Sequence, residues 1–89
     1  MISEKDKSAI LSLAEQYTVK KLYVFGSAAD PSRPSNDIDL GVLGLAAERF
    51  FDFYGDLIFN LSKPVDLIDV SKNTRFNDLI KRERTQIYG

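Results

Sequence analysis

The first third of the chain predicts a helix followed by a buried strand. Ser3, with Asp6 three residues later, is typical of a helix start. Apolar residues then recur at helical spacing at positions 10, 13, 14 and 17, which predicts a helix that ends near Thr18. The next segment, Lys21 to Phe25, is rich in aromatic and branched residues and therefore predicts a short, largely buried strand.

The middle of the chain predicts a strand, a helix and another strand. The segment from Asp37 to Leu43 alternates at its start between acidic and apolar residues, as a strand with two different faces does. Leu45 to Leu61 carries an apolar stripe at positions 46, 50, 53, 57 and 61, which is the spacing of a helix. Val65 to Val70 predicts a third strand.

The C-terminal part predicts a final helix that is charged on one side. Its apolar markers are Phe76, Leu79 and Ile80, with Ile87 as a candidate continuation. Strands separated by helical segments indicate an α/β or α+β fold, in which helices flank a small mixed β-sheet. The 26–36 loop is too long for a tight hairpin, but the first two strands can still pair directly.

Length, charge and composition narrow the chemistry. A chain of 89 residues predicts one small domain, residues 1–89. Its net charge of −1 supplies no overall basic field for nucleic acid, although a local basic patch is compatible with it. Because the chain has no cysteine and no histidine, we exclude thiol nucleophiles, Ser-His-Asp catalysis and imidazole-ligated metals. No apolar run approaches the roughly 20 residues of a membrane span, so we expect a cytoplasmic protein.

Three aspartates occur in strand contexts that suit metal chemistry. Asp37 and Asp39 lie two residues apart in a strand and point to one face, with Cα atoms about 6.5–7 Å apart. Carboxylates this close repel each other, and Mg²⁺ relieves that repulsion because it takes carboxylate and phosphate oxygens as ligands. Asp66 has apolar neighbours, among which an unpaired charge is expensive. It either joins the same site, if the second and third strands are neighbours, or forms a salt bridge with a lysine or arginine.

Gly26 and Ser27, directly after the first strand, predict a phosphate-binding bend. Glycine lets the backbone approach a ligand closely, and backbone N–H groups with a hydroxyl suit a phosphate. Carboxylates together with such a bend indicate a phosphoryl- or nucleotidyl-transfer site. Two metal ions there would activate an acceptor hydroxyl and stabilise the leaving pyrophosphate.

The order Gly-Ser, nine residues, Asp-x-Asp and a later strand aspartate resembles the nucleotidyltransferase superfamily that includes DNA polymerase β. The short chain is similar to its minimal nucleotidyltransferase (MNT) branch. The resemblance implies the polymerase β-like palm fold, with Mg²⁺ and a nucleoside triphosphate, ATP first among the candidates. It implies that Asp37 and Asp39 bind two Mg²⁺ ions and that Asp66 is the third metal-binding carboxylate, near the acceptor. Gly26 and Ser27 would bind the triphosphate.

The resemblance also implies a partner. MNT proteins often pair with a helical HEPN protein as antitoxin and toxin, which implies transfer of AMP from ATP to a hydroxyl on such a partner. One segment departs from the family pattern, because many relatives carry an arginine soon after Gly-Ser and this chain has Asp30 and Pro31 instead. Arg33 is a candidate replacement for that arginine. The departure leaves two alternatives: a weakly active or inactive binding module that neutralises a HEPN-like toxin by complex formation, or a homodimer with a vestigial site.

Two other features leave alternatives open. Asp69 competes with Asp66 as the third carboxylate, but in a regular strand the two face opposite ways, and Asp69 is expected to end the strand or cap the following turn. Phe51 and Phe59 fall outside the apolar stripe of their predicted helix, with Gly55 on the same side. These aromatic residues belong either to a thick core helix or to an interface with a partner or a second copy.

Overall fold

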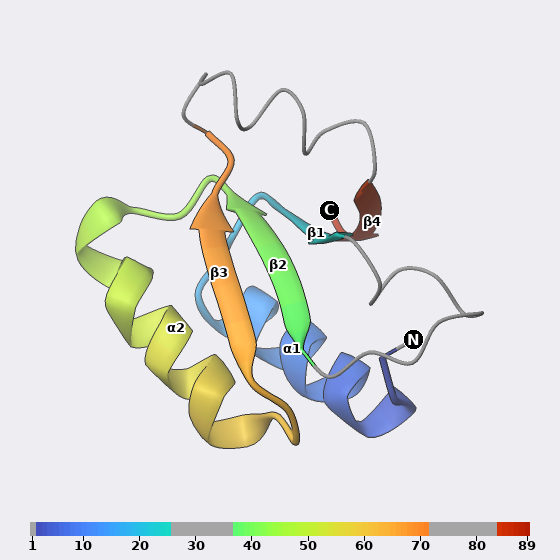
Figure 1. Ribbon diagram of the computed structural model, residues 1–89. Helices are drawn as coiled ribbons and strands as arrows, with labels where there is room; N and C mark the ends of the chain where they lie inside the picture. Colours follow the sequence, from blue (N-terminus) through green and yellow to red (C-terminus); the bar gives the residue numbers. More distant parts are fainter. Residues whose placement is uncertain (1, 26–36, 72–83) are drawn as a thin grey trace.

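The structure is a computed structural model, and it describes residues 2–25, 37–71 and 84–89. Within these residues, two helices and four strands make up an α+β fold, and Figure 1 shows the helices and the sheet as two layers. In chain order, the elements are α1 (Glu4–Gln16), β1 (Lys21–Phe25), β2 (Ile38–Leu43), α2 (Ala47–Asn60), β3 (Val65–Asp69) and β4 (Arg84–Tyr88).

The four strands form one mixed sheet in the order β3-β2-β1-β4. β1 pairs antiparallel with both β2 and β4, whereas β2 and β3 are parallel and are connected through α2. The register places Lys21 opposite Leu43 and Phe25 opposite Asp39. The prediction that the first two strands pair directly is therefore confirmed.

Helix α1 begins as its sequence predicts. The Ser3 hydroxyl oxygen accepts a hydrogen bond from the backbone N–H of Asp6 at 3.2 Å, which caps the helix. The Asp6 side chain is buried, and its carboxylate accepts hydrogen bonds from the backbone N–H and the hydroxyl of Ser62. These bonds hold the start of α1 against the segment that leads into β3. The helix ends at its C-cap Tyr17, and Thr18 follows in the left-handed region with φ 52°.

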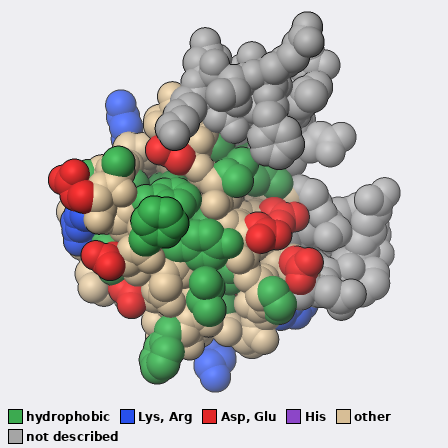
Figure 2. Space-filling model, turned by 60° about the vertical axis from the view of Figure 1, so that its left-hand side comes forward, with side chains coloured by type: hydrophobic (Ala, Val, Ile, Leu, Met, Phe, Trp, Pro, Cys, Tyr) green, Lys and Arg blue, Asp and Glu red, His purple; other side chains and the backbone are tan. Residues whose placement is uncertain are grey.

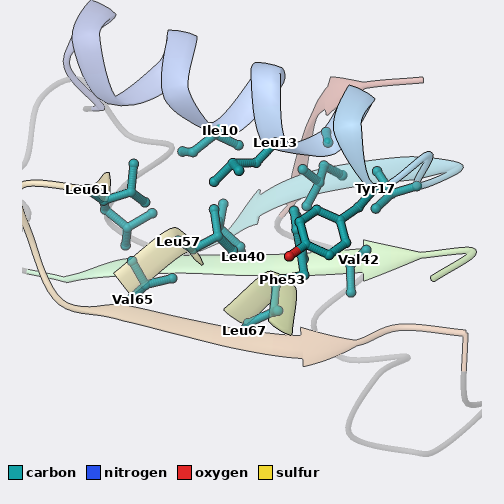
Figure 3. Packing of buried hydrophobic residues seen from close by; sticks show 14 of the residues in the cluster. Ile10, Leu13, Tyr17, Leu40, Val42, Phe53, Leu57, Leu61, Val65 and Leu67 are labelled. Atoms are coloured by element: carbon teal, nitrogen blue, oxygen red, sulfur yellow. The ribbon is translucent and has the colours of Figure 1, made fainter. Parts of the chain in front are cut away.

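The main hydrophobic core lies between the two helices and one face of the sheet (Figure 3). The inward strand positions alternate, as the sequence pattern of β2 predicts. The largest fully buried side chains are Phe53, Ile10, Leu22, Ile38, Leu40, Leu57 and Val42. The edge of the Tyr17 ring also packs against Phe53, with the ring centroids 5.2 Å apart, and joins α1 to α2.

Helix α2 buries only one of its faces. Phe53 and Leu57 are fully buried, whereas Phe51, Ile58 and Phe59 are 80%, 59% and 87% exposed. The interpretation of Phe51 and Phe59 as parts of a thick core helix is therefore wrong. Across the described residues, neither α1 nor α2 has the length and hydrophobicity that crossing a lipid bilayer demands.

The prediction that the C-terminal helix continues to Ile87 is wrong. Ile87 lies in β4, where it and Tyr88 are half-buried and pack against the main core. Phe76, Leu79 and Ile80 lie outside the described residues. Residues 84–88 form a strand because β1 offers an unpaired edge, and such a long-range pairing is not encoded in local hydrophobic spacing.

Candidate active site

The parallel pairing of β2 with β3 places Asp39 directly beside Asp66. Residues in register on adjacent strands project from the same face of a sheet, so the two side chains are neighbours. Asp66 is accordingly among the groups that raise the pKa of the Asp39 carboxyl group. The second and third strands are thus neighbours, which is the condition under which Asp66 can join the site of Asp39. The structure pairs Asp66 with another carboxyl group.

Asp37 lies one residue before β2, and its side chain is exposed. Its charge acts on Asp39, but more weakly than the charge of Asp66 does. Over residues 2–25, 37–71 and 84–89, no three side chains of the metal-ligand types form a group that could already hold an ion. The structure therefore shows an Asp39–Asp66 pair, which we call the carboxylate pair, with Asp37 as a more distant neighbour.

The surroundings of Asp39 raise the pKa of its carboxyl group above the ordinary value. Partial burial is the main cause, followed by the negative charges of Asp66 and Asp37 and by the hydrogen bond that the protonated Asp39 carboxyl group donates to Asp66. Each of these effects disfavours an isolated negative charge, and a divalent cation would reverse them. Because the donors are carboxylate oxygens, the pair fits Mg²⁺ rather than a metal that prefers nitrogen or sulfur ligands.

An apolar cluster lies beside the carboxylate pair on the same face of the sheet. Phe25, the cross-strand partner of Asp39, is buried there with Tyr23 and Val70. The Phe25 ring lies against Gly41. A Cβ at position 41 would come within 2.5 Å of the ring and 2.8 Å of Val70 Cγ1, so the close contact requires glycine. Sequence reasoning missed this contact, although a glycine inside an alternating strand often marks a close approach.

The two aspartates of β3 have different roles in the fold. The Asp66 side chain is exposed while Val65 and Leu67 beside it are buried, so the expectation of a costly charge among apolar neighbours is wrong. Among the described strands β3 lies at the edge of the sheet, and the Asp66 side chain on it is exposed. Asp69 accepts hydrogen bonds from the backbone N–H and the hydroxyl of Ser71 at 2.9 and 2.6 Å, which confirms its predicted capping of the turn.

The predicted phosphate contacts, Gly26 and Ser27, lie outside the described residues, and so do Asp30 and Arg33. The last described residue before them is Phe25, which pairs with Asp39. The chain therefore leaves β1 next to the carboxylate pair.

Comparison with known proteins agrees with this geometry. Residues 8–89 match the model of the family described as polymerase beta, nucleotidyltransferase, and the chain belongs to this family. No curated protein matches the chain by sequence.

Solved structures share the fold at low sequence identity. A chain of a toxin–antitoxin crystal structure with AMP-PNP has a TM-score of 0.75 at 23% identity, over 93% of this chain and 73% of that one. A chain of the complex between a tri-AMPylated HEPN toxin of Shewanella oneidensis and an MNT antitoxin has a TM-score of 0.72 at 22% identity, over 94% and 70%. A chain of the toxin–antitoxin complex MntA–HepT has a TM-score of 0.73 at 20% identity, over 98% and 73%.

Proposed function

We propose that this chain transfers AMP from ATP to a hydroxyl group of a partner protein, with Mg²⁺ bound at the carboxylate pair. The observation that supports this most directly is the adjacency of Asp39 and Asp66 in a member of the nucleotidyltransferase family. In the reaction, the acceptor oxygen forms a bond to the α-phosphorus of ATP. The bond from that phosphorus to its bridging oxygen breaks, and pyrophosphate leaves.

The different exposure of the carboxylates supports different roles for them. Asp39 is partly buried and surrounded by like charge, so it gains most from a cation and would hold the metal together with Asp37 and Asp66. When bound, two Mg²⁺ ions would neutralise the phosphate charge and activate the acceptor hydroxyl. Asp66 is exposed on an edge strand, where a macromolecule can approach, and it would also accept the proton of that hydroxyl. Gly26 and Ser27 would bind the triphosphate.

The nature of the acceptor is supported by the structural neighbours. One neighbour contains AMP-PNP, and another contains a HEPN toxin that carries AMP groups in complex with an MNT antitoxin. We therefore propose that ATP is the donor, that a HEPN-type toxin is the partner, and that this chain acts as its antitoxin. The acceptor is a tyrosine or another hydroxyl side chain of that toxin.

Incubation with labelled ATP, Mg²⁺ and a purified HEPN-type toxin tests the proposal. The wild type should label the partner, and Asp39→Asn should reduce the rate at least about 100-fold, because it removes a metal-binding charge. Asp69→Asn is the matched control, since it changes the other β3 aspartate while keeping an oxygen for the Ser71 hydrogen bonds. Equal labelling by wild type and Asp39→Asn contradicts the catalytic assignment.

A second function, neutralisation by binding alone, is favoured by the exposed aromatic rings of α2. A module of this kind would mask the toxin without using the carboxylate pair. Growth rescue of cells that express the toxin separates the two functions. Under the binding function, Asp37→Asn leaves rescue intact while Phe51→Asp abolishes it. Under the catalytic function, Asp37→Asn abolishes rescue as well.

A further inference from the structure

We propose that the exposed side of α2 is a docking surface for a helix of the partner protein, one whose apolar side chains are bordered by lysine or arginine. An apolar side chain of that helix enters a notch at Gly55, and its basic side chains face Glu48 and Asp52. The partner is the one in the proposed function, on which this inference therefore rests. The surface itself is separate from the carboxylate pair.

The docking surface is an apolar stripe along one side of α2. Phe51, Ile58 and Phe59 are the large hydrophobic side chains that the described residues leave exposed, and all three belong to this helix. Relative to Phe51, the residues at +4, +7 and +8 share one helix face. In Figure 2, hydrophobic side chains gather at the centre of this side of the molecule, with acidic side chains on either side of them. A continuous patch of this kind indicates a protein interface.

Gly55 forms a notch in the middle of the stripe. Glycine destabilises a helix interior relative to alanine, so a glycine at this position suggests a role other than helix formation. A Cβ at Gly55 would meet no atom of the described residues within 4 Å, so contacts with this part of the chain do not require glycine there. Phe51 lies one turn before the notch, and Ile58 and Phe59 lie one turn after it. This arrangement leaves a hole that a side chain of a facing helix can enter.

The charges beside the stripe indicate what the partner carries. Glu48 and Asp52 are exposed. Asp56, one turn further on, is half-buried, and its carboxylate accepts a hydrogen bond from the Tyr17 hydroxyl at 2.6 Å. The one basic residue of the helix, Arg49, is directed toward α1: its guanidinium lies 4.5 Å from the centre of the Tyr17 ring. The side of α2 next to the stripe is therefore negative, and it complements a basic border on the facing helix.

The same charges favour a different protein over a second copy of this chain. In an antiparallel pairing of two α2 helices, the two-fold axis would bring both acidic rows to the same side of the interface, where they repel each other. A parallel pairing would align the helix dipoles unfavourably. A basic partner helix avoids both problems.

Calorimetric titration of the chain with the HEPN-type toxin used in the labelling assay tests the inference. Phe51→Asp should weaken binding more than about tenfold, as expected for a central apolar anchor. Ser12→Asp, which adds the same charge on the exposed side of α1, should leave the affinity unchanged. Gly55→Gln should weaken binding several-fold while raising the melting temperature, so the loss cannot come from misfolding. Asp52→Lys should weaken binding and reduce its dependence on salt.

Three results would overturn the inference. The first is wild-type affinity in both Phe51→Asp and Gly55→Gln, and the second is no complex with the wild type at all. The third is a homodimer in sedimentation that Phe51→Asp abolishes, because it would assign the surface to a second copy. Failure of the proposed function looks different, since it leaves binding intact and shows equal labelling by wild type and Asp39→Asn. If Phe51→Asp binds normally and AMP transfer is still lost in Asp39→Asn, the docking surface is wrong and the function stands.

Discussion

The carboxylate pair and the exposed side of α2 depart in opposite ways from the rule that charges face water and apolar side chains are buried. On the sheet face, Asp39 lies partly buried beside an apolar cluster, where its charge is disfavoured. On the helix, Phe51 and Phe59 lie in water, where their rings are disfavoured. Each region would gain free energy from a complement that the described part of the chain does not supply, a cation in the first and an apolar surface in the second. Such local departures are where a fold most often carries its function.

Each region also contains a glycine, and the two glycines differ. Gly41 is crowded, because a Cβ there would come within 2.5 Å of the Phe25 ring. Gly55 faces open space. The first is required by contacts inside the chain, whereas none of the described residues accounts for the second.

Opposite sides of α2 give the largest expected contrast. Phe53→Ala should destabilise the protein by about 3–5 kcal/mol, because it leaves a cavity in the main core. Phe51→Ala, on the exposed side, should change the free energy of unfolding by no more than about 0.5 kcal/mol. Urea denaturation of both variants measures the contrast. A large destabilisation by Phe51→Ala would show that the exposed side serves the fold and not a partner.

Gly41→Ala should destabilise the protein by about 1–3 kcal/mol, since the added methyl group forces the Phe25 ring and Val70 away from the strand. Because Phe25 is the cross-strand partner of Asp39, the same change should disturb the carboxylate pair. Denaturation and Mg²⁺-dependent nucleotide binding, measured on the same sample, test both effects. Unchanged stability would contradict the close contact between the ring and the strand.

Gly55→Ala should have the opposite sign. It should stabilise the protein by about 0.5–1 kcal/mol, because alanine is the better helix former and the added Cβ meets no atom. The melting temperature of this variant, compared with that of Gly41→Ala, sharpens the distinction between the two glycines. Destabilisation by Gly55→Ala would mean that glycine is needed inside the fold.

Asp39→Asn should have the smallest effect on stability, and the effect depends on pH. The raised pKa of Asp39 means that the folded state binds more protons than the unfolded state. The stability of the metal-free protein therefore falls as the pH rises from the ordinary aspartate pKa through the raised one, and the asparagine variant lacks this fall. At neutral pH the variant should be more stable than the wild type by less than about 1 kcal/mol, because the pair is partly solvated.

Thermal melts with and without Mg²⁺ check this last prediction. Mg²⁺ should raise the melting temperature of the wild type and have little effect on Asp39→Asn. Asp69→Asn serves as the control, since Asp69 caps a turn away from the pair. A wild type that is more stable than the variant at every pH without metal would contradict the repulsion at the pair.

Local chemistry in the sequence predicts most of the regular elements. The Ser3 cap, the alternation in β2 and the apolar stripe of α2 depend on neighbours only a few residues away, and all three agree with the structure. Ile87 shows where such reasoning fails, because a pairing with the distant β1 decides its conformation. The exposure of Asp66 was mispredicted for the same reason, since the apolar residues beside it do not reveal that α1 and α2 both pack on the opposite face of the sheet.

The sequence by itself determined the kinds of side chain available: carboxylates without histidine or cysteine, a helix with aromatic residues on two sides, and a family motif that implies nucleotide chemistry. The tertiary structure alone decided that Asp39 lies beside Asp66, that Phe25 covers Gly41, and which aromatic rings of α2 face water. The physical reason is that the two depend on interactions over different distances along the chain. Spacing along a chain specifies the face on which a side chain lies, whereas strand order and register specify which side chains from distant segments meet on that face.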